Sequence, residues 1–301
     1  MATATPHITP TCTDFRSVAR ALTIVENNLT GAAELLKSLT FNIHTPVTGI
    51  TGPPGAGKST LVNAIINNLV QLGKKVAVLA IDPTSPFNFG SLLGDRIRMA
   101  SHFNHPDVFI RSLATRGSLG GLSAKTIEMT DVLKASGFDH IIVETVGVGQ
   151  SEVEIAGLAD ITFVMLVPEA GDEIQNIKSG LMEIADAFII NKADREGADL
   201  FINNLKKILQ QSKENKVSIF KTVASKNEGI GAITDFILSN PKIKNTRREL
   251  LLTQKVYNII QQNKMAGIDK KKLQQDIAKA TKAGTFNIYK FAEEYGAPPA
   301  P

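Results

Sequence analysis

The stretch Gly52-Pro-Pro-Gly-Ala-Gly-Lys58-Ser59 decides the fold of this chain. It follows a β-branched run at 47–51 and precedes an amphipathic stretch at 59–72, so a strand, a glycine-rich loop and a helix are predicted in succession. Glycines let the backbone N–H groups of such a loop wrap around phosphate oxygens, and the helix N-terminus adds its dipole. The predicted phosphate-binding loop consists of Gly52, Pro53, Pro54, Gly55, Ala56, Gly57, Lys58, Ser59 and Thr60.

Two side chains of this loop are expected to act directly on a bound nucleotide. The spacing G-x-x-x-x-G-K-[ST] places a lysine and a hydroxyl residue where the helix begins. Lys58 is expected to neutralise the β and γ phosphates of a nucleoside triphosphate, and the Ser59 hydroxyl is expected to bind Mg²⁺. The loop therefore predicts a nucleotide-binding protein that uses magnesium.

Short β-branched runs alternate with amphipathic stretches from about residue 46 to 240. Strands separated by helices require crossover connections, which make the strands parallel and place helices on both faces of the sheet. The sequence thus predicts an α/β fold with a doubly wound, mostly parallel sheet. The expected strands lie at 47–51, 76–81, 108–110, 141–143, 161–167, 188–190 and 217–220.

Helical extensions are expected on both sides of this region. Residues 1–45 contain apolar positions at helical spacing with a break at Thr30-Gly31, which predicts a pair of helices. Residues 241–301 are also helical in pattern, and their Pro- and Ala-rich tail is expected to be disordered. We therefore predict an N-terminal extension at 1–45, a nucleotide-binding domain at 46–240 and a C-terminal helical arm at 241–301.

Acidic residues near the ends of predicted strands supply candidate metal ligands. Glu144 ends a buried run and precedes Gly147 by three positions, where a γ-phosphate sensor belongs, and its long arm suits a magnesium-bound water. Asp82 ends another run, and a loop carrying Asp95 and Arg98 is expected to reach the metal from the opposite side. We predict a magnesium site formed by Ser59, Asp82, Asp95 and Glu144, and catalytic roles for Lys58, Asp82, Arg98 and Glu144.

The motif N-K-x-D, formed by Asn191, Lys192 and Asp194, comes directly after a predicted strand. An ionised Asp194 only accepts hydrogen bonds, so it matches the N1 and N2 donors of guanine. Adenine would leave this carboxylate unpaired, at a cost of several kcal/mol. Asn191 is expected to brace the loop, and the Lys192 stem to cover the base. The sequence therefore predicts GTP as the substrate, with no covalently bound cofactor.

Composition and charge agree with this class and exclude others. Of 301 residues, 43% are hydrophobic and 6% aromatic, which suits an α/β core better than an all-β sandwich. The net charge is +4, but the lysines lie along helical faces without interleaved aromatics, so no nucleic-acid partner is expected. No apolar run approaches the roughly 18 to 20 residues that span a bilayer, so no membrane partner is expected. The single Cys12 indicates a reducing compartment, and we expect a cytoplasmic protein.

At this point the sequence resembles the MeaB/ArgK/MMAA GTPases, which act as chaperones of adenosylcobalamin-dependent acyl-CoA mutases. The resemblance covers about residues 45–240 and, more loosely, both helical ends. Four stretches support it: GPPGAGKST at 52–60, DPTSPFNFGSLLGDRIRM at 82–99, ETVGVGQSE at 144–152 and PEAGDEIQNIKSGLMEIAD at 168–186. The last two are far more specific to this family than the phosphate-binding loop.

The resemblance implies a function, a partner and further site residues. The partner would be an adenosylcobalamin-dependent acyl-CoA mutase, whose cofactor loading and protection the GTPase would gate, and C-terminal helices would form a homodimer. A switch segment containing Asp172, Gln175 and Lys178 would respond when the mutase docks. A late base loop would be formed by Val223, Ala224 and Ser225, of which Ala224 or Ser225 would contact guanine O6 through a backbone N–H.

The sequence departs from the family at two places and leaves alternatives open. Phe89-Gly90 stands where the family has two glycines, and Val223-Ala224 stands where it has Ser-Ala. No Gln directly follows the turn from Glu144 to Gly147, so positioning of the attacking water is expected to need the partner. The alternatives are a nickel metallochaperone GTPase and an older assignment as an arginine/ornithine transport kinase. Which mutase is served, methylmalonyl-CoA, isobutyryl-CoA or another, stays open.

Overall fold

The computed structural model describes residues 8–40, 45–82, 99–114, 124–145, 151–168, 181–211, 217–240, 247–265 and 268–296. The chain divides into two compact units, Met1–Leu251 and Leu252–Pro301. The first contains the whole sheet, and the second contains only helices among its described residues. Among the described residues, no helix combines the length and apolarity needed to cross a membrane.

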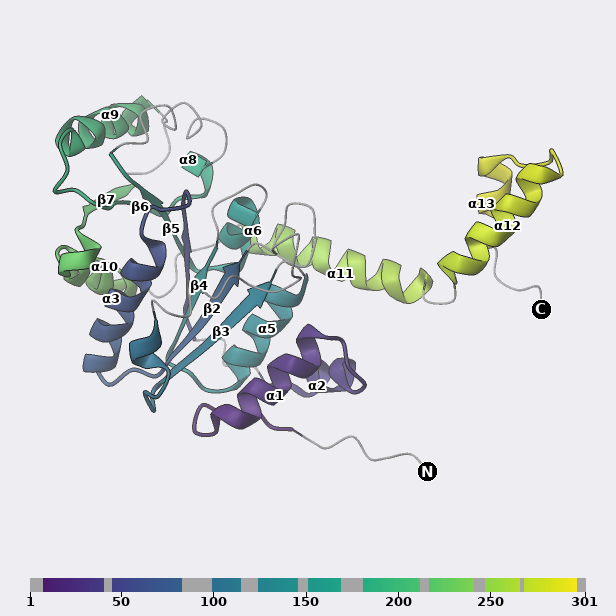
Figure 1. Ribbon diagram of the computed structural model, residues 1–301, viewed down its shortest axis with the longest axis horizontal. Coiled ribbons are helices and arrows are strands. Elements are labelled where there is room, and N and C mark those ends of the chain that lie inside the picture. The colour runs from purple at the N-terminus through teal and green to yellow at the C-terminus, as the bar shows by residue number, and fades with distance from the viewer. Residues whose placement is uncertain are drawn as a thin grey trace. The chain divides into compact units, whose positions relative to one another are not determined.

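A seven-stranded sheet forms the centre of the first unit, in the order β3-β2-β4-β1-β5-β6-β7 (Figure 1). Every strand pair is parallel, so the predicted α/β fold is confirmed. Each predicted run became a strand, because β-branched residues buried on both faces favour parallel pairing. The strands are β1 (Val47–Thr51), β2 (Val76–Asp82), β3 (Val108–Ala114), β4 (His140–Glu144), β5 (Ile161–Leu166), β6 (Ala187–Ile190) and β7 (Ser218–Lys221).

Helices cover both faces of the sheet, because alternate residues of each strand point to opposite sides. Val78 and Ile142 belong to the apolar cluster shared with α3 (Lys58–Gln71) and α10 (Ile230–Ser239). Their neighbours Leu79 and Val143 belong to a cluster on the other face. The helices of that second face include α5 (Ala124–Ala135), α6 (Ser151–Leu158), α8 (Leu181–Ile184) and α9 (Ala198–Gln211).

The strand order places the predicted site at the carboxyl ends of the central strands of the sheet. From β1 the chain moves outward to β2 and β3, then returns so that β4 lies between β2 and β1, while β5 pairs with the other side of β1. Ligands of open α/β sheets bind at such a reversal, outside the carboxyl ends of the strands. In the register of β1 and β4, Ile50 lies opposite Glu144, so the phosphate-binding loop and Glu144 leave the sheet side by side.

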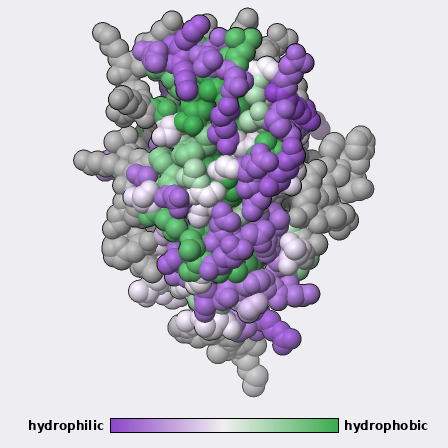
Figure 2. Space-filling model, turned by 90° about the vertical axis from the view of Figure 1, so that its left-hand side faces the viewer, coloured by the Kyte–Doolittle hydropathy of each residue, from purple (hydrophilic) through white to green (hydrophobic). Residues whose placement is uncertain are grey.

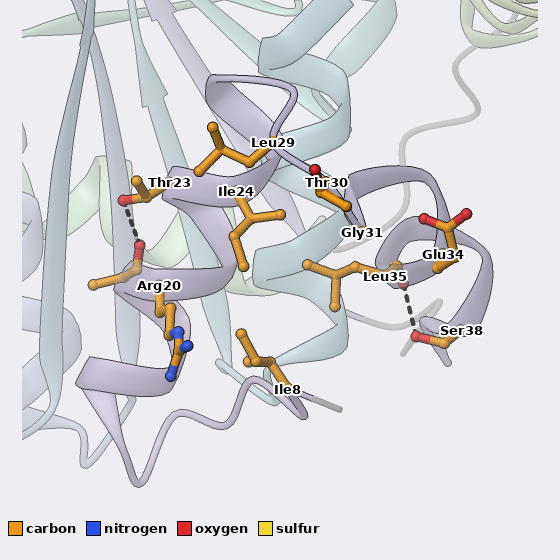
Figure 3. Close-up of a pocket in the computed structure, with 11 residues that line it drawn as sticks. Ile8, Arg20, Thr23, Ile24, Leu29, Thr30, Gly31, Glu34, Leu35 and Ser38 are labelled. Carbon is orange, nitrogen blue, oxygen red and sulfur yellow. Dashed lines mark hydrogen bonds between the residues drawn. The ribbon is translucent and has the colours of Figure 1, made fainter. Parts of the chain in front are cut away.

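The N-terminal helices α1 (Phe15–Glu26) and α2 (Ala32–Ser38) pack on the first unit, α1 mainly against α5. The Phe15 ring lies 5.5 Å from that of Phe109 and 6.1 Å from that of Phe138, measured between centroids. The two helices enclose a cavity of about 700 Å³ (Figure 3). Its lining includes the apolar side chains of Ile24, Leu29 and Leu35 and the charged side chains of Arg20 and Glu34.

The side of the molecule where α3, α9 and α10 lie in Figure 1 is seen face on in Figure 2. Hydrophilic residues form broad bands there, with apolar residues between them. On α9, Phe201, Ile202 and Leu205 are buried while Lys206 and Lys207 are exposed, as helical spacing predicts for a surface helix.

The C-terminal segment is helical, as its apolar spacing predicts. α11 (Arg247–Met265) crosses from the first unit into the second and is followed by α12 (Lys270–Lys282) and α13 (Ile288–Gly296). Asp269 caps α12, since its carboxylate accepts hydrogen bonds from the backbone N–H groups of Lys271 and Lys272. The Pro- and Ala-rich tail from 297 onward lies outside the described residues.

Candidate nucleotide-binding site

The loop after β1 has the backbone geometry that phosphate binding requires. Gly52, Gly55 and Gly57 adopt φ values of 144°, 79° and 95°, which residues with a side chain rarely adopt. A Cβ atom on Gly52 would lie 2.1 Å from the Met165 carbonyl oxygen, and one on Gly57 would lie 2.6 Å from Asn191 Nδ2. Glycine is therefore needed at all three positions for the turn, and at Gly52 and Gly57 also because Met165 of β5 and Asn191 after β6 approach closely.

Lys58 is the first residue of α3 and folds back over the loop. Its Nζ donates hydrogen bonds to the carbonyl oxygens of Gly52, at 2.7 Å, and Pro53, at 3.0 Å. The residue is only 8% exposed, so its charge is held in a region with little water, where it acts more strongly on an anion. This arrangement places an ammonium group at the mouth of the loop that is predicted to hold the β and γ phosphates.

Ser59, in the first turn of α3, and Glu144, at the end of β4, meet next to this loop. The Ser59 hydroxyl donates a 2.8 Å hydrogen bond to Glu144 Oε1, and both residues are buried. Next to them, the Thr145 hydroxyl donates a 2.9 Å hydrogen bond to Thr51 Oγ1, which ties the ends of β4 and β1 together. The structure thus brings two predicted magnesium ligands, 85 residues apart in the sequence, within hydrogen-bond distance.

Asn191 connects three parts of the site. Its Nδ2 donates to the Ala56 carbonyl oxygen of the phosphate-binding loop at 2.8 Å. Its Oδ1 accepts from the Thr222 hydroxyl at 3.1 Å and from the Ala224 backbone N–H at 3.0 Å. Because the side chain is 3% exposed, these bonds are shielded from water and hold the loops after β1, β6 and β7 in one arrangement.

Lys192 and Asp194 lie on the loop after β6. Lys192 has a positive φ of 55°, and its Nζ donates to the Gly55 carbonyl oxygen at 2.9 Å, so its stem crosses the phosphate-binding loop. The Asp194 carboxylate is 42% exposed and accepts a 3.0 Å hydrogen bond from Lys226 Nζ. This hydrogen bond is the main reason why the pKa of Asp194 lies below its ordinary value, so the carboxylate is ionised at neutral pH.

The predicted base loop of Val223, Ala224 and Ser225 follows β7 and contains the short helix η2 (Ala224–Lys226). The Ala224 N–H donates to Asn191, so an additional contact with guanine O6 would have to share or replace that bond. Val223 is bridged to Glu228 through backbone hydrogen bonds in both directions, which closes the loop.

Several predicted residues lie outside the described part of the chain. They are Asp95 and Arg98 of the predicted metal-facing loop, and Asp172, Gln175 and Lys178 of the predicted switch. Asp82 is described as the last residue of β2, but nothing is described of its side chain. In the register of β2 and β4, Ala80 lies opposite Glu144, so the Asp82 backbone ends the strand next to the one that carries Glu144.

Three residues of the site were not found by the sequence reasoning. Thr222 holds Asn191, Met165 lies against Gly52, and Lys226 pairs with Asp194. No local motif marks any of them, because each is brought to the site by strand pairing and not by spacing along the chain. Thr222 alone had a positional signal, since it lies two residues after the predicted seventh strand at 217–220.

The large cavity between α1 and α2 is separate from this site. Its wall consists of residues between Ile8 and Ser38, none of which was predicted to bind the nucleotide. The described loops after β1, β4, β6 and β7 instead form the site at the carboxyl edge of the sheet. There they bring together a buried ammonium group, a hydroxyl–carboxylate pair and an exposed ionised carboxylate. Such a set matches a triphosphate, a cation and a hydrogen-bond-donating base.

Comparisons with known proteins identify the family of this chain. The family model described as methylmalonyl-CoA mutase-associated GTPase MeaB matches residues 18–281. A Pyrococcus horikoshii protein named as a GTPase is 43% identical, with 94% of this chain and 92% of the relative covered. The Escherichia coli GTPase ArgK is 43% identical over 59% of this chain and 55% of its own. The mouse methylmalonic aciduria type A homolog is 35% identical over 72% of this chain and 58% of its own.

Solved structures with a similar fold are also known. The crystal structure of an LAO/AO transport system kinase aligns with a TM-score of 0.63 at 25% identity, covering 93% of this chain and 92% of that one. HypB from Helicobacter pylori aligns with a TM-score of 0.50 at 17% identity and covers 76% of this chain and 99% of that one. At this identity the likeness concerns the fold alone. The family match spans most of the sequence, and so the chain belongs to the MeaB family and is a P-loop GTPase.

Proposed function

We propose that this GTPase binds Mg²⁺ and GTP at the carboxyl edge of the sheet. In this proposal the loop Gly52–Thr60 surrounds the phosphates, and Lys58 exchanges its carbonyl partners for phosphate oxygens. Asn191 holds the loop, Lys192 covers the base, and Asp194 accepts the guanine donors. The backbone of Ala224 or Ser225 faces guanine O6. The observation that supports it best is the network of Asn191, which joins the phosphate and base loops directly.

The residues around Ser59 fit a magnesium ion. A hydroxyl and a carboxylate oxygen lie 2.8 Å apart in a buried position, and hard divalent cations prefer such oxygen ligands. Ser59 would bind the ion directly, with Glu144 accepting a bond from one of its waters, and Asp82 and Asp95 would complete the sphere. The ion would neutralise charge on the phosphates and hold them in position. Arg98 would add a positive charge from the loop that it shares with Asp95.

For the biological role, we propose that hydrolysis gates cofactor loading and protection of an adenosylcobalamin-dependent acyl-CoA mutase. The support is the family description, which names association with methylmalonyl-CoA mutase, and the mouse relative that is named after methylmalonic aciduria. The predicted switch residues Asp172, Gln175 and Lys178 would transmit mutase docking to the nucleotide. A cytoplasmic location, supported by the single Cys12, is part of the same proposal.

A stimulation assay tests this role. A cognate adenosylcobalamin-dependent acyl-CoA mutase is expected to raise phosphate release at least about tenfold, a barrier change of roughly 1.4 kcal/mol. The double variant Gln175→Ala/Lys178→Ala is expected to keep GTP affinity and basal hydrolysis but to lose this stimulation. The reason is that groups acting only in the partner-bound state leave the free protein's rate unchanged. The measurement is single-turnover phosphate release with and without the mutase.

A matched control comes from α9, where Lys207 and Gln210 have the same residue types at the same separation and are exposed. The variant Lys207→Ala/Gln210→Ala should respond to the mutase as the wild type does. Loss of basal turnover in the Gln175/Lys178 variant would instead make these residues part of the intrinsic site. Unchanged hydrolysis of the wild type in the presence of the mutase would contradict the chaperone role.

We also propose that the chain forms a homodimer through its C-terminal arm. Leu252, Val256, Ile259 and Ile260 of α11 recur at helical spacing, and each is at least 42% exposed. A second copy would remove this apolar stripe from water. Val256→Glu/Ile259→Glu is expected to convert dimer to monomer in sedimentation equilibrium, whereas Leu200→Glu, at an exposed leucine on α9, should not. A wild-type chain that sediments as a monomer at all concentrations would disprove this interface.

A further inference from the structure

Asp194 has a cationic partner that lies outside the N-K-x-D motif. Lys226 Nζ donates a hydrogen bond to Asp194 Oδ2 at 3.0 Å. The two residues are on different loops, Asp194 after β6 and Lys226 at the end of η2, which follows β7. The bond lowers the pKa of Asp194 and raises that of Lys226, so both groups carry their charges at neutral pH. The base-recognition carboxylate thus has one of its oxygens engaged by a lysine.

This contact has different consequences for different purine bases. Guanine presents two donors, the N1–H and the 2-amino group, and therefore needs both oxygens of an ionised carboxylate. Hypoxanthine has the same N1–H but no 2-amino group, so it needs only one oxygen. A guanine nucleotide must accordingly share Oδ2 with Lys226 or displace it, while a hypoxanthine nucleotide can use Oδ1 and leave the pair intact.

We propose that Lys226 is a specificity-determining residue that takes the place of the guanine 2-amino group on Asp194. The proposal rests on the role of Asp194 in base recognition proposed above. In the wild-type site, the missing amino group of an inosine nucleotide is replaced by the Lys226 ammonium group, so the carboxylate keeps a full set of donors. The site therefore discriminates guanine from hypoxanthine less than the same site would without Lys226.

The size of the effect follows from the exposure of the pair. The side chains of Lys226 and Asp194 are 57% and 42% exposed, and ion pairs at such positions contribute little because water screens them. Competition with Lys226 for Oδ2 is accordingly expected to weaken guanine nucleotide binding by about two- to fivefold. A change of this size is measurable when two ligands with identical phosphates are compared.

The test compares dissociation constants for GDP and IDP in the wild type and in Lys226→Met, which keeps an unbranched side chain of similar length. GDP is expected to bind about two- to fivefold more tightly to the variant, because no competitor for Oδ2 remains. IDP affinity should stay nearly constant, because in the wild type the Lys226–Asp194 pair is present both in the free protein and in its complex with IDP. The IDP/GDP ratio of dissociation constants should therefore rise by the same factor.

A neighbouring ion pair provides the control. Lys221 on β7 pairs with Asp199 on α9, and its side chain is 52% exposed, so Lys221→Met removes an equivalent charge. This variant should leave the IDP/GDP ratio unchanged. Salt provides an independent readout, because screening weakens exposed pairs. The wild-type ratio should approach that of Lys226→Met at about 1 M salt, where the Debye length is about 3 Å.

An unchanged or smaller ratio in Lys226→Met would overturn the proposal. A proportional loss of affinity for both nucleotides would also overturn it, since Lys226 would then contact a group that both bases share, such as O6. Asp194→Asn, measured in parallel, separates this failure from failure of the base site. If Asp194→Asn shifts preference toward xanthine nucleotides while Lys226→Met leaves the ratio unchanged, only the role of Lys226 is wrong.

Discussion

Lys58→Ala is expected to reduce GTP hydrolysis by at least roughly 10²- to 10³-fold, the loss typical when one preorganised charged or hydrogen-bonding group is removed from a transition state. Lys58 Nζ is bonded to the carbonyl oxygens of Gly52 and Pro53 at the mouth of the loop and is nearly buried. Alanine leaves no positive charge there to balance the negative charge of the β and γ phosphates. The measurement is single-turnover phosphate release at saturating GTP.

The fold of this variant should be intact, because alanine favours helix formation at the start of α3 and the apolar clusters do not depend on the ammonium group. Lys74→Ala, in the turn that follows the same helix, is the matched control and should hydrolyse GTP at the wild-type rate. Circular dichroism and thermal unfolding of all three proteins check the fold. Wild-type turnover in a folded Lys58→Ala would disprove the assignment of the phosphate-binding loop.

Asp194→Asn is expected to weaken GTP binding by roughly 10- to 100-fold, since hydrogen bonds to a charged group are stronger than those between neutral groups. An asparagine presents an N–H group where the carboxylate accepted the guanine 2-amino group, so a favourable contact becomes a repulsive one. Xanthine has a carbonyl oxygen at C2, which can accept from this N–H. The preference should therefore move from GTP toward xanthosine triphosphate, as measured by competition with a fluorescent nucleotide.

Asp199→Asn is the control for this substitution, because Asp199 is also an exposed aspartate paired with a lysine, but on α9. It should leave the base preference unchanged. The result for Asp194 also depends on the loop being in place, which Asn191 ensures through its bonds to Ala56 and Ala224. Equal GTP affinity of Asp194→Asn and wild type would contradict the base-site assignment.

Local chemistry made much of this protein predictable. The phosphate-binding loop could be recognised because glycines with positive φ and a following helix are required at fixed positions, and Gly52, Gly55 and Gly57 have this geometry. The strands could be recognised because residues buried on both faces form continuous β-branched runs. The ends of the strands were less exact: β3 extends to Ala114, four residues beyond the predicted 108–110, because pairing with β2 continues there.

The sequence by itself determined the parallel α/β fold, the loop that holds phosphate and the N-K-x-D residues, because these depend on side chains at short, fixed separations. Only the tertiary structure decided which distant residues meet. The pairing of β4 with β1 brings Glu144 to Ser59, and that of β7 with β6 brings Thr222 to Asn191 and Lys226 to Asp194. Lys226 is one of 33 Lys and Arg residues, and no spacing rule distinguishes it. An ion pair between loops depends on the register of the strands that carry them, and that register is set by the packing of the whole sheet.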